Sequence, residues 1–504
     1  MKPLVIRADA GPAIGSGHLM RCLALAEAWK DNGGDVIVVL ATSAPLLEER
    51  LATEVTGIVH ITSVPGSPDD ACDTVRIAEE HAATRVVVDG YQFGAEYQKH
   101  LKDAGLSLLV IDDYGHAAHY YADIVLNQNS YADMSFYPQH EPGTRFLLGT
   151  PYALLRREFL AWAGYRRIIP PVARKVLVTF GGGDPEDLTG AVTEILRMAA
   201  VEDLEVNILA GGMYPHFEEL QSRVADLPRF SIRKNVTNMP ELMAWADVAI
   251  SAGGSTCWEL AFMGLPSLLY TAADNQARTV DHLVAQGMAE RLTKEDLFDP
   301  GAGLKKISGL LFSEENREAM SRRMRAFVDG EGAFRVSMVL KNEPVRLRRV
   351  REEDRDLVYR WINDPDVRSC SFRPHFITPE EHGNWFSSIL VDPGMLYLIA
   401  VDEHDRPVGQ ARFRIDGGHA VISVMMEPAS RNKGLGSQVI GIATRILFAR
   451  SPVSEVHAFI KTGNESSVRA FAKAGYIPEG RTSVENQEAY HMKRRRGDDA
   501  WGIE

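Results

Sequence analysis

The sequence predicts an α/β protein with two successive, doubly wound parallel sheets and then a third α/β domain on a mixed, largely antiparallel sheet. Up to about residue 165, β-branched runs such as "DVIVVLA" and "RVVVDGY" alternate with amphipathic stretches. The alternation restarts near residue 174 with "RKVLVTFGGGD" and "ADVAISAGG". Strands alternating with helices indicate βαβ units. The longer strands "MLYLIAVDEHDRPVGQARFRI" and "HAVISVMMEP" that follow favour antiparallel pairing.

The 504 residues exceed what one hydrophobic core usually serves, so two to four domains are expected. The strand and helix patterns place three, at 1–165, 166–338 and 344–498. A net charge of -13 disfavours a nucleic-acid binder. The four cysteines are scattered, which argues against a disulfide framework and fits a reducing cytosol. We find no signal peptide and no apolar run near the roughly 18 residues that span a bilayer, so we expect a cytoplasmic protein without membrane contact. The oligomeric state is not predicted.

The first glycine-rich turn, "GPAIGSGHLMRC", joins a strand to a helix. Its spacing matches neither the dinucleotide fingerprint nor a P-loop. Such a turn presents backbone N–H groups and the positive end of a helix dipole. His18 would lie near this helix start, where the dipole favours the neutral imidazole that a general base needs. The alternative is a capped histidine of the core.

The second glycine-rich turn, "SAGGSTCWEL", combines two glycines with Ser255 and Thr256 at a helix start. This combination suits a diphosphate, and Glu259 one turn later could accept hydrogen bonds from ribose hydroxyls. The alternative is an ordinary glycine-rich loop with a helix N-cap. Asp112 and Asp113 are adjacent on a strand and point to opposite faces, so they would chelate one ion poorly. We therefore expect no metal.

An ordered set of motifs over residues 1 to about 330 resembles the UDP-sugar hydrolases of pseudaminic acid biosynthesis and, more distantly, the spore-coat polysaccharide and MurG-like GT-B families. The motifs are "IRADAGPAIGSGHLMRCLALA", "VVVDGY", "LLVIDDYGH", "LLGTPYALLRREF", "TFGGGDP", "SAGGSTCWEL" and "DNQ". The resemblance implies two Rossmann-like domains in a GT-B arrangement and metal-free attack of water, activated by His18, on the anomeric carbon of a UDP-sugar. The substrate-binding residues it implies are Asp9, Gly17, Asp89 and Tyr91 for the sugar, Gly253, Gly254, Ser255 and Thr256 for the diphosphate, Glu259 for the ribose, and Asn275 and Gln276 for sugar or phosphate.

The segment "VMMEPASRNKGLGSQVI" carries the R-x-x-G-x-G/A signature of GNAT acetyltransferases, and "KTGNESSVRAFAKAGY" resembles their second signature. Backbone amides at the helix start would cradle the pyrophosphate of acetyl-CoA. The residues expected to bind acetyl-CoA are Met426, Arg431, Asn432, Lys433, Gly434, Leu435, Gly436, Ser437 and Asn464. Phe471 stands where many GNAT enzymes have a tyrosine that protonates the CoA thiolate, which leaves the source of that proton open.

The stretch "RWINDPDVRSCSFRPHFITPEEHGNWF" resembles the acceptor side of acetyltransferases that act on nucleotide-linked amino sugars. Arg368, His382 and Trp385 are its candidate substrate contacts, with a core position as the alternative for Trp385. The two resemblances together suggest a bifunctional enzyme that N-acetylates a UDP-4-amino sugar and then removes UDP. A glycosyltransferase, an enzyme for another 2,4-diamino sugar, and a GNAT domain that acetylates proteins or only binds CoA remain alternatives.

Overall fold

The computed structural model describes residues 2–11, 15–199, 201–212, 214–234, 236–341, 345–402 and 405–497. The chain forms two compact units, one of residues 1–30 and 34–337 and the other of residues 31–33 and 338–504. Part of the predicted boundary, residues 342–344, and the predicted C-terminal limit at residue 498 lie outside the described residues. The three-domain division therefore stays a prediction.

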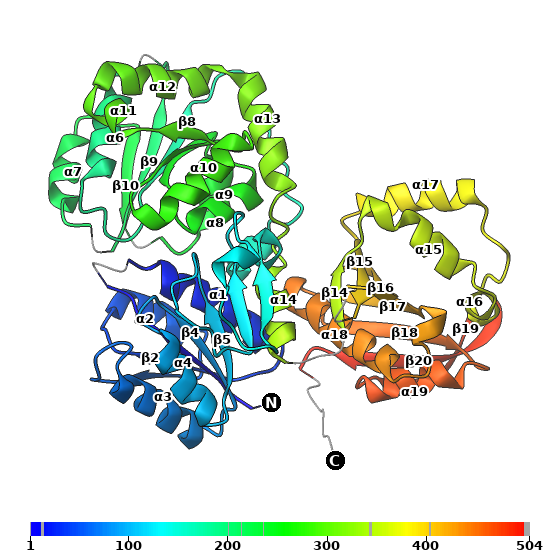
Figure 1. The fold of residues 1–504 in the computed structure, drawn as a ribbon. Helices are drawn as coiled ribbons and strands as arrows, with labels where there is room; N and C mark the ends of the chain where they lie inside the picture. The colour runs from blue at the N-terminus through cyan, green and yellow to red at the C-terminus, as the bar shows by residue number, and fades with distance from the viewer. Residues whose placement is uncertain are drawn as a thin grey trace. The chain divides into compact units, whose positions relative to one another are not determined.

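The first sheet of the larger unit is seven-stranded and entirely parallel, in the order β3-β2-β1-β4-β5-β6-β7. Its strands β2, β4 and β5 are labelled in Figure 1. Its strands are β1 (Leu4–Ala8), β2 (Val36–Leu40), β3 (Gly57–His60), β4 (Arg85–Asp89), β5 (Ser107–Ile111), β6 (Ile124–Asn127) and β7 (Arg145–Leu148). The helices of this part are α1 (Gly17–Asp31), α2 (Pro45–Ala52), α3 (Pro68–Glu80), α4 (Ala95–Asp103) and α5 (Arg157–Leu160). β1 and β4 are buried along almost their whole length, which explains their continuous β-branched runs.

The second sheet of this unit has six parallel strands in the order β10-β9-β8-β11-β12-β13. Its strands are β8 (Lys175–Thr179), β9 (Glu205–Ala210), β10 (Phe230–Lys234), β11 (Val248–Ala252), β12 (Ser267–Tyr270) and β13 (Glu290–Leu292). Its helices are α6 (Leu188–Arg197), α7 (Phe217–Arg223), α8 (Met239–Trp245), α9 (Thr256–Met263), α10 (Ala277–Ala285), α11 (Lys294–Phe298), α12 (Pro300–Phe312), α13 (Glu314–Arg325) and α14 (Gly332–Leu340).

Both sheets reverse their strand order, between β1 and β4 in the first and between β8 and β11 in the second. In open α/β sheets, ligands bind at the carboxyl ends of the strands beside such a reversal. The start of α14 returns to the first part of the unit, where Arg335 Nη1 donates to the carbonyl oxygen of Pro151 at 2.6 Å. We therefore expect a ligand-binding site at the loops that follow β1, β4 and β11.

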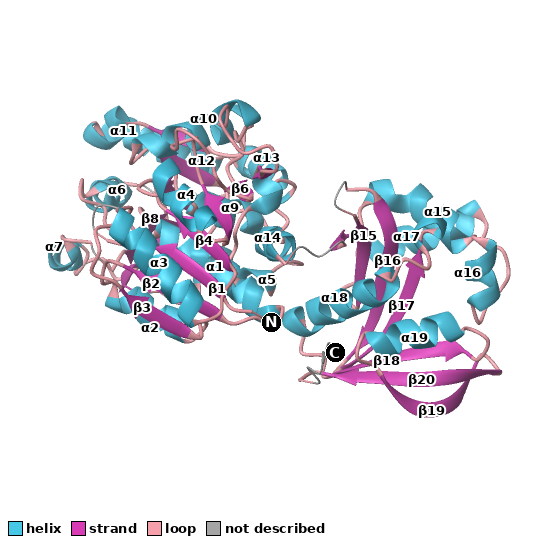
Figure 2. Ribbon diagram, turned by 60° about the horizontal axis from the view of Figure 1, so that its bottom comes forward, coloured by secondary structure: helices cyan, strands magenta, loops and turns pink. Residues whose placement is uncertain are grey.

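The smaller unit is built on a seven-stranded mixed sheet in the order β14-β15-β16-β17-β18-β20-β19 (Figure 2). Every strand pair is antiparallel except β17 with β18, which is parallel. Its strands are β14 (Arg346–Arg349), β15 (Met395–Val401), β16 (Pro407–Asp416), β17 (His419–Met426), β18 (Glu455–Lys461), β19 (Ile477–Val484) and β20 (Gln487–Arg495). Its helices are α15 (Arg355–Ile362), α16 (Pro365–Cys370), α17 (Pro379–Leu390), α18 (Leu435–Arg450) and α19 (Glu465–Lys473).

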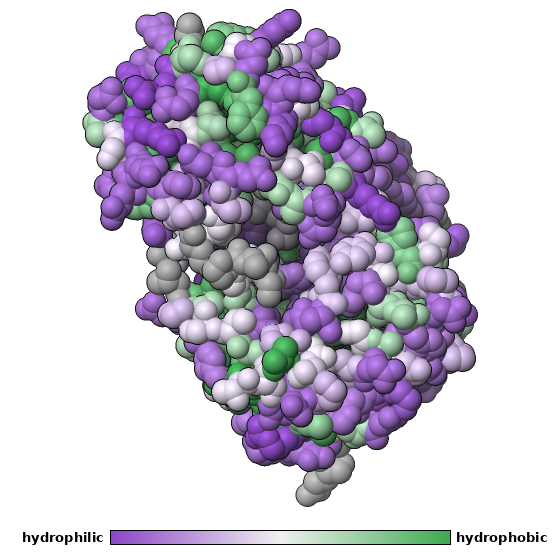
Figure 3. All heavy atoms as spheres, turned by 60° about the vertical axis from the view of Figure 1, so that its left-hand side comes forward, coloured by the Kyte–Doolittle hydropathy of each residue, from purple (hydrophilic) through white to green (hydrophobic). Residues whose placement is uncertain are grey.

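The predicted fold class is confirmed: two parallel, Rossmann-like sheets precede a mixed sheet. Each sheet has an apolar core, and in the smaller unit α15 and α17 pack against β15 through Trp361, Phe386 and Ile399. Within the described ranges, no helix is long and apolar enough to cross a membrane. The face in Figure 3 is mostly hydrophilic, with apolar side chains in separate groups.

Candidate active sites

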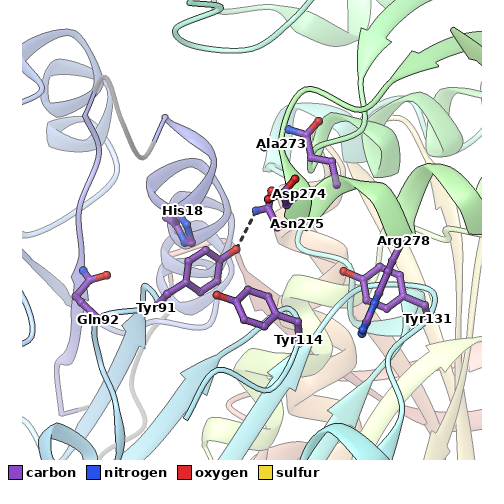
Figure 4. Close-up of a pocket in the computed structure, with 10 residues that line it drawn as sticks. His18, Tyr91, Gln92, Tyr114, Tyr131, Ala273, Asp274, Asn275 and Arg278 are labelled. Carbon is purple, nitrogen blue, oxygen red and sulfur yellow. Dashed lines mark hydrogen bonds between the residues drawn. The ribbon is translucent and has the colours of Figure 1, made fainter. Parts of the chain in front are cut away.

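A pocket of about 660 Å³ opens at the strand ends of the larger unit. Its walls come from the residues that follow β1, β4, β5, β6 and β12, which bring both sheets to one site. The lining residues are His18, Tyr91, Gln92, Tyr114, Tyr131, Ala273, Asp274, Asn275, Gln276 and Arg278 (Figure 4). Four of the residues predicted from the sequence, His18, Tyr91, Asn275 and Gln276, are among them.

His18 lies in the first turn of α1 and forms a pair with Asp89 at the end of β4. Its Nδ1 atom is 2.6 Å from Asp89 Oδ1, and its side chain is only 11% exposed. Because an ionised carboxylate can only accept, the neutral imidazole carries its proton on Nδ1 and keeps Nε2 as an acceptor. This is the orientation in which a histidine works as a general base.

Arg21, one helical turn after His18, holds the Asp89 carboxylate in place. Arg21 Nε and Nη2 each donate to Asp89 at 2.6 Å, and Nη1 donates to Asp113 at 2.8 Å. Burial alone would raise the pKa of Asp89, but Arg21 and His18 outweigh it and hold that pKa well below its ordinary value. Asp89 is therefore a fixed anion beneath His18.

Tyr91 connects this buried network to the second sheet. Its hydroxyl donates to Asp113 Oδ2 at 2.7 Å. The same hydroxyl accepts from Asn275 Nδ2 at 3.1 Å, the hydrogen bond drawn in Figure 4. Burial and the neighbouring Asp113 raise the pKa of Tyr91 well above its ordinary value, so the phenol stays protonated. Its ring also meets the His18 ring edge-on, with the centroids 5.2 Å apart. Tyr91 therefore fixes the imidazole from the side of the pocket.

The turn between β11 and α9 faces the start of α1. A Cβ atom placed on Gly17 would lie 3.8 Å from Ser255 Oγ, so the two glycine-rich turns approach each other. Ser255 is the N-cap residue of α9, but its side chain makes no capping hydrogen bond. A Cβ atom on Gly253 would come within 2.3 Å of Val280 Cγ2, so this turn packs tightly against α10. The Ser255 hydroxyl is therefore not committed to holding the helix.

Glu259 lies one turn into α9 and is held by Arg156. Arg156 Nη2 donates to Glu259 Oε1 at 2.7 Å, and Arg156 Nε donates to the same oxygen at 3.2 Å. Both described contacts use Oε1, which leaves Oε2 as an acceptor. Thr256 is the first residue of α9 and, like Gly254, is partly exposed.

Asp9 does not line the pocket, in contrast to the predicted sugar contact. It is 1% exposed, its Oδ2 pairs with Arg7 at 2.7 Å, and its Oδ1 accepts from the backbone N–H of Ala41 at 2.7 Å. Its carboxylate is used to fix the loop after β2. Asp89 is likewise behind His18 and does not line the pocket, so it acts through the imidazole.

Asp112 and Asp113 follow the end of β5 (Ser107–Ile111) and do not lie on the strand as predicted, but their carboxylates still have separate partners. Asp112 accepts from the backbone N–H groups of Tyr114 and Gly115 at 2.7 and 2.8 Å. Burial would raise its pKa, but His116, the Tyr120 hydroxyl and the backbone N–H of Gly115 lower it to about 2. Asp113 serves Arg21 and Tyr91 instead.

Sequence reasoning missed Arg21, Tyr114, Tyr131 and Arg278. Arg21 carried a signal, because a lone arginine within the apolar stretch "LMRCLALAEAW" requires a buried acidic partner. Burial and Asp113 raise the pKa of Tyr131 to about 12. The aromatic residues carried no such signal, since they reach the pocket from separate loops.

In the smaller unit, the turn before α18 has the form expected of an anion-binding loop. Asn432 and Gly434 have positive φ angles of 60° and 75°, which turns the backbone sharply into the helix. Asn432, Lys433 and Gly434 are exposed, and the 16-residue helix α18 begins at Leu435. Ser437 is buried and donates to the carbonyl oxygen of Gly434 at 3.0 Å, which closes the turn.

Two other residues of this predicted cofactor site have structural partners. Arg431 donates to Asp364 and Asp366, both at 2.7 Å, so its guanidinium is held at the start of α16. Asn464 caps α19 by accepting from the Ser467 N–H at 3.1 Å. Met426 ends β17 beside this turn, with its Cγ 3.8 Å from a Cβ atom placed on Gly436.

Phe471 is buried and packs edge-on against Tyr476, with the ring centroids 5.0 Å apart. The Tyr476 hydroxyl is buried against Thr444 Oγ1 at 2.7 Å. Burial raises the pKa of Tyr476 well above its ordinary value, so the phenol stays protonated. It is therefore a core residue and does not replace the missing tyrosine.

The three acceptor-side candidates are not brought together on an open surface. His382 is 2% exposed and surrounded by Tyr359, Trp385 and Phe386. Trp385 packs against the same apolar core, which is the alternative that the sequence left open for it. Arg368 Nη1 donates to the carbonyl oxygen of Arg373 at 3.2 Å and so supports the following loop. The burial of His382 argues against direct contact with a substrate.

Comparison with known proteins identifies both parts of the chain. Residues 175–331 match the glycosyltransferase family 28 C-terminal domain, and residues 345–477 match the acetyltransferase (GNAT) domain. The chain is therefore an enzyme that carries a domain of the glycosyltransferase family 28 C-terminal type and, after it, a GNAT acetyltransferase domain.

Particular relatives cover different lengths of the chain. An uncharacterised protein of Methanocaldococcus jannaschii is 22% identical over 494 residues, which are 94% of this chain and 96% of the relative. A spore coat polysaccharide biosynthesis protein of Bacillus subtilis is 26% identical over 250 residues, 49% of this chain and 73% of its own. The UDP-2,4-diacetamido-2,4,6-trideoxy-beta-L-altropyranose hydrolase of Campylobacter jejuni is 25% identical over 220 residues, 43% of this chain and 73% of its own.

Proposed function

We propose that the chain catalyses two consecutive steps on a UDP-linked amino sugar of pseudaminic acid biosynthesis. The GNAT domain acetylates the 4-amino group of UDP-4-amino-4,6-dideoxy-N-acetyl-β-L-altrosamine with acetyl-CoA as donor. The larger unit then hydrolyses UDP-2,4-diacetamido-2,4,6-trideoxy-β-L-altropyranose to the free sugar and UDP. The name of the Campylobacter relative supports the second substrate. The fusion supports the pairing, because the product of the first step is the substrate of the second.

The observation that carries the hydrolytic step is the buried Asp89–His18 pair at the wall of the pocket. His18 Nε2 takes a proton from water while the water oxygen bonds to the anomeric carbon. The bond from that carbon to the diphosphate oxygen breaks, and UDP leaves with the electron pair. Asp89 stabilises the imidazolium that forms, and Arg21 keeps Asp89 ionised and oriented. This chemistry uses no metal.

The nucleotide is proposed to lie against the start of α9. The Ser255 hydroxyl, uncommitted to capping, and the Thr256 hydroxyl suit a diphosphate beside the helix dipole. Glu259, oriented by Arg156, retains one carboxylate oxygen for the ribose hydroxyls. Gly17 faces Ser255 without a side chain, which leaves room between the two turns for the sugar phosphate.

In the acetylation step, the sugar amine attacks the thioester carbonyl carbon and the CoA thiolate leaves. The amine nitrogen loses a proton, and the thiolate gains one. The exposed backbone of Asn432, Lys433 and Gly434 at the start of α18 suits the pyrophosphate of acetyl-CoA. Because Phe471 has no hydroxyl, water is the proposed proton donor to the thiolate. We place both activities in the cytoplasm, where acetyl-CoA and sugar nucleotides are available.

The test supplies the full chain with the UDP-4-amino sugar and acetyl-CoA and follows the products by mass spectrometry. The expected sequence is the acetylated UDP-sugar, then UDP and the free diacetamido sugar. His18→Ala should stop at the acetylated UDP-sugar, while His60→Ala, which removes a surface histidine paired with Glu48, should behave as the unchanged protein. Release of UDP at an unchanged rate by His18→Ala contradicts the hydrolytic assignment.

The glycosyltransferase alternative is distinguished in the same assay. A glycosyltransferase would release UDP only when an alcohol acceptor is present, and the sugar would appear on that acceptor. A panel of other UDP-4-amino sugars tests the stereochemistry. Retained CoA binding without acetylation of any amino sugar would favour a CoA-binding module or a protein acetyltransferase.

A further inference from the structure

The outer face of the C-terminal sheet carries a histidine–carboxylate cluster that neither proposed reaction uses. His419 begins β17 and Glu455 begins β18, and the two are register partners in the one parallel pair of this sheet. His457 lies two residues after Glu455, so its side chain is on the same face. The atoms His419 Nδ1 and Glu455 Oε2 are 3.6 Å apart, and His457 Nε2 is 3.8 Å from the same Oε2. We name these three residues the His419–Glu455–His457 cluster.

The second contacts of this cluster orient its atoms. Glu455 directs Oε1 to Arg495 Nε at 2.8 Å and keeps Oε2 for the two imidazoles. His457 Nδ1 is 2.9 Å from His491 Nε2, so a proton on Nδ1 donated to His491 leaves His457 Nε2 free. A hydrogen bond from the far nitrogen of a histidine is the usual support of a metal-ligating imidazole.

We propose that the His419–Glu455–His457 cluster is a binding site for a divalent transition metal, with Zn²⁺ as the best fit. Its ligands are His419 Nδ1, His457 Nε2 and Glu455 Oε2, with water in the fourth position. All three ligand atoms lie within 4.8 Å of one another. Zinc bonds of about 2.0–2.1 Å at a tetrahedral angle place ligand atoms roughly 3.4 Å apart, so closure requires shifts of only a few tenths of an ångström for the two measured pairs.

The ligand types select among metals. Two imidazoles and one carboxylate suit zinc and its neighbours, whereas Ca²⁺ and Mg²⁺ require mostly oxygen ligands. Arg495 and Lys493 lie nearby and oppose any cation, but Arg495 is directed to Glu455 Oε1, and Lys493 pairs with Glu479 Oε2 at 3.3 Å and with Glu455 Oε1 at 3.8 Å. Imidazole coordination is therefore required to hold a metal here, which disfavours the hard cations further.

The position of the cluster suggests what a metal would do. The described ladder between β17 and β18 joins only three residue pairs, His419 with Glu455, Ala420 with Val456 and Val421 with His457. A metal bonded to both strands would fasten them at the paired end. The site therefore stabilises the C-terminal domain, and this inference does not depend on the proposed reactions.

The test uses the full chain, stripped with a chelator and titrated at pH 7.5 with Zn²⁺ alone, and with Co²⁺ as a spectroscopic probe. We expect one equivalent of Zn²⁺ that is absent from the His419→Ala/His457→Ala double variant, and at least a tenfold weaker affinity in Glu455→Gln. Bound Co²⁺ should show the intense visible bands of low coordination. At pH 5.5 binding should be lost, because protons compete for the imidazoles.

The matched control is His119→Ala, which removes the histidine of an exposed His–Glu pair, His119 with Glu141 at 2.9 Å. It should bind as much zinc as the unchanged chain. Circular dichroism of each metal-free variant verifies folding. The proposal is overturned if the unchanged chain takes up no more zinc than the folded double variant.

Discussion

Asp89→Asn separates the electrostatic role of Asp89 from its size. An asparagine keeps the shape and one acceptor oxygen, but its amide donates to His18 Nδ1 and forces the imidazole proton onto Nε2, away from the task of a base. The histidine would then hold the wrong tautomer. We expect the rate constant of UDP release to fall about 10⁴-fold, the size of effect known for a mispositioned tautomer in a catalytic triad.

The same substitution also weakens the fold, by an amount that follows from the contacts. Asp89 accepts two hydrogen bonds of 2.6 Å from the buried Arg21. Breaking a buried ion pair costs about 3–5 kcal/mol, and the remaining partner Asp113 places the expected loss near the lower end. Urea unfolding of the full chain measures this loss, and activity is measured only at temperatures where the variant is folded.

A double-mutant cycle with His18→Ala decides whether the two effects are connected. If Asp89 acts through the imidazole, Asp89→Asn should lower UDP release by no more than about threefold once His18 is absent. The reasoning is refuted if folded Asp89→Asn retains a rate within tenfold of the unchanged enzyme. It is also refuted if Asp89→Asn causes the same loss of rate with and without His18.

Three further predictions concern stability. Gly253→Ala should lower the free energy of unfolding, measured by urea titration, by about 1–3 kcal/mol, because the new Cβ would come within 2.3 Å of Val280 Cγ2. Gly254→Ala is the control: the nearest atom to its new Cβ lies at 3.8 Å, so the free energy of unfolding should be nearly unchanged. Burial raises the pKa of Glu27 from 4.5 to about 7, so between these pH values the folded chain binds more protons than the unfolded chain. The free energy of unfolding should therefore fall by about 3 kcal/mol as the pH rises from 4.5 to 7. Glu27→Gln should remove this fall, and an equal pH dependence of stability in both proteins would contradict the prediction. Asn464→Ala removes the N-cap of α19 and should lower the free energy of unfolding by about 1 kcal/mol. Asn464→Asp, which keeps a capping oxygen, is the control and should unfold at a higher temperature than Asn464→Ala.

Local patterns in the sequence predict the helices and strands and the order in which the three sheets follow one another along the chain. β1 and β4 are continuous β-branched runs because both faces of a parallel strand are buried. The glycine-rich turns and the helices that follow them are likewise local features. His18 could be identified as a candidate base because its position at a helix start is a property of neighbouring residues.

The partners of His18 could not be predicted from local sequence patterns. Asp9 directly follows β1 and Asp89 is the last residue of β4, yet Asp9 fixes the loop after β2 while Asp89 contacts His18. Which of the two carboxylates faces α1 depends on how α1 packs across the neighbouring strands β1 and β4. Arg21 was missed for the same reason, since its two acidic partners are 68 and 92 residues away.

In the C-terminal domain, too, some features follow from local sequence and others depend on tertiary packing. The exposed turn before α18 follows from its own glycines, whereas the core position of His382 depends on aromatic side chains from α15 and α17. The His419–Glu455–His457 cluster has no zinc-like spacing along the chain, because strand pairing rather than sequence distance brings its residues together.

The sequence by itself therefore determined the fold class, the glycine-rich turns and the histidine at the start of α1, because each depends on residues close together in the chain. Only the tertiary structure decided which charged groups meet. The Asp89–His18–Arg21 network, the wall shared by Tyr91 and Asn275, and the burial of His382 all join distant segments. Their chemistry depends on a low-dielectric environment that exists only after the sheets have formed.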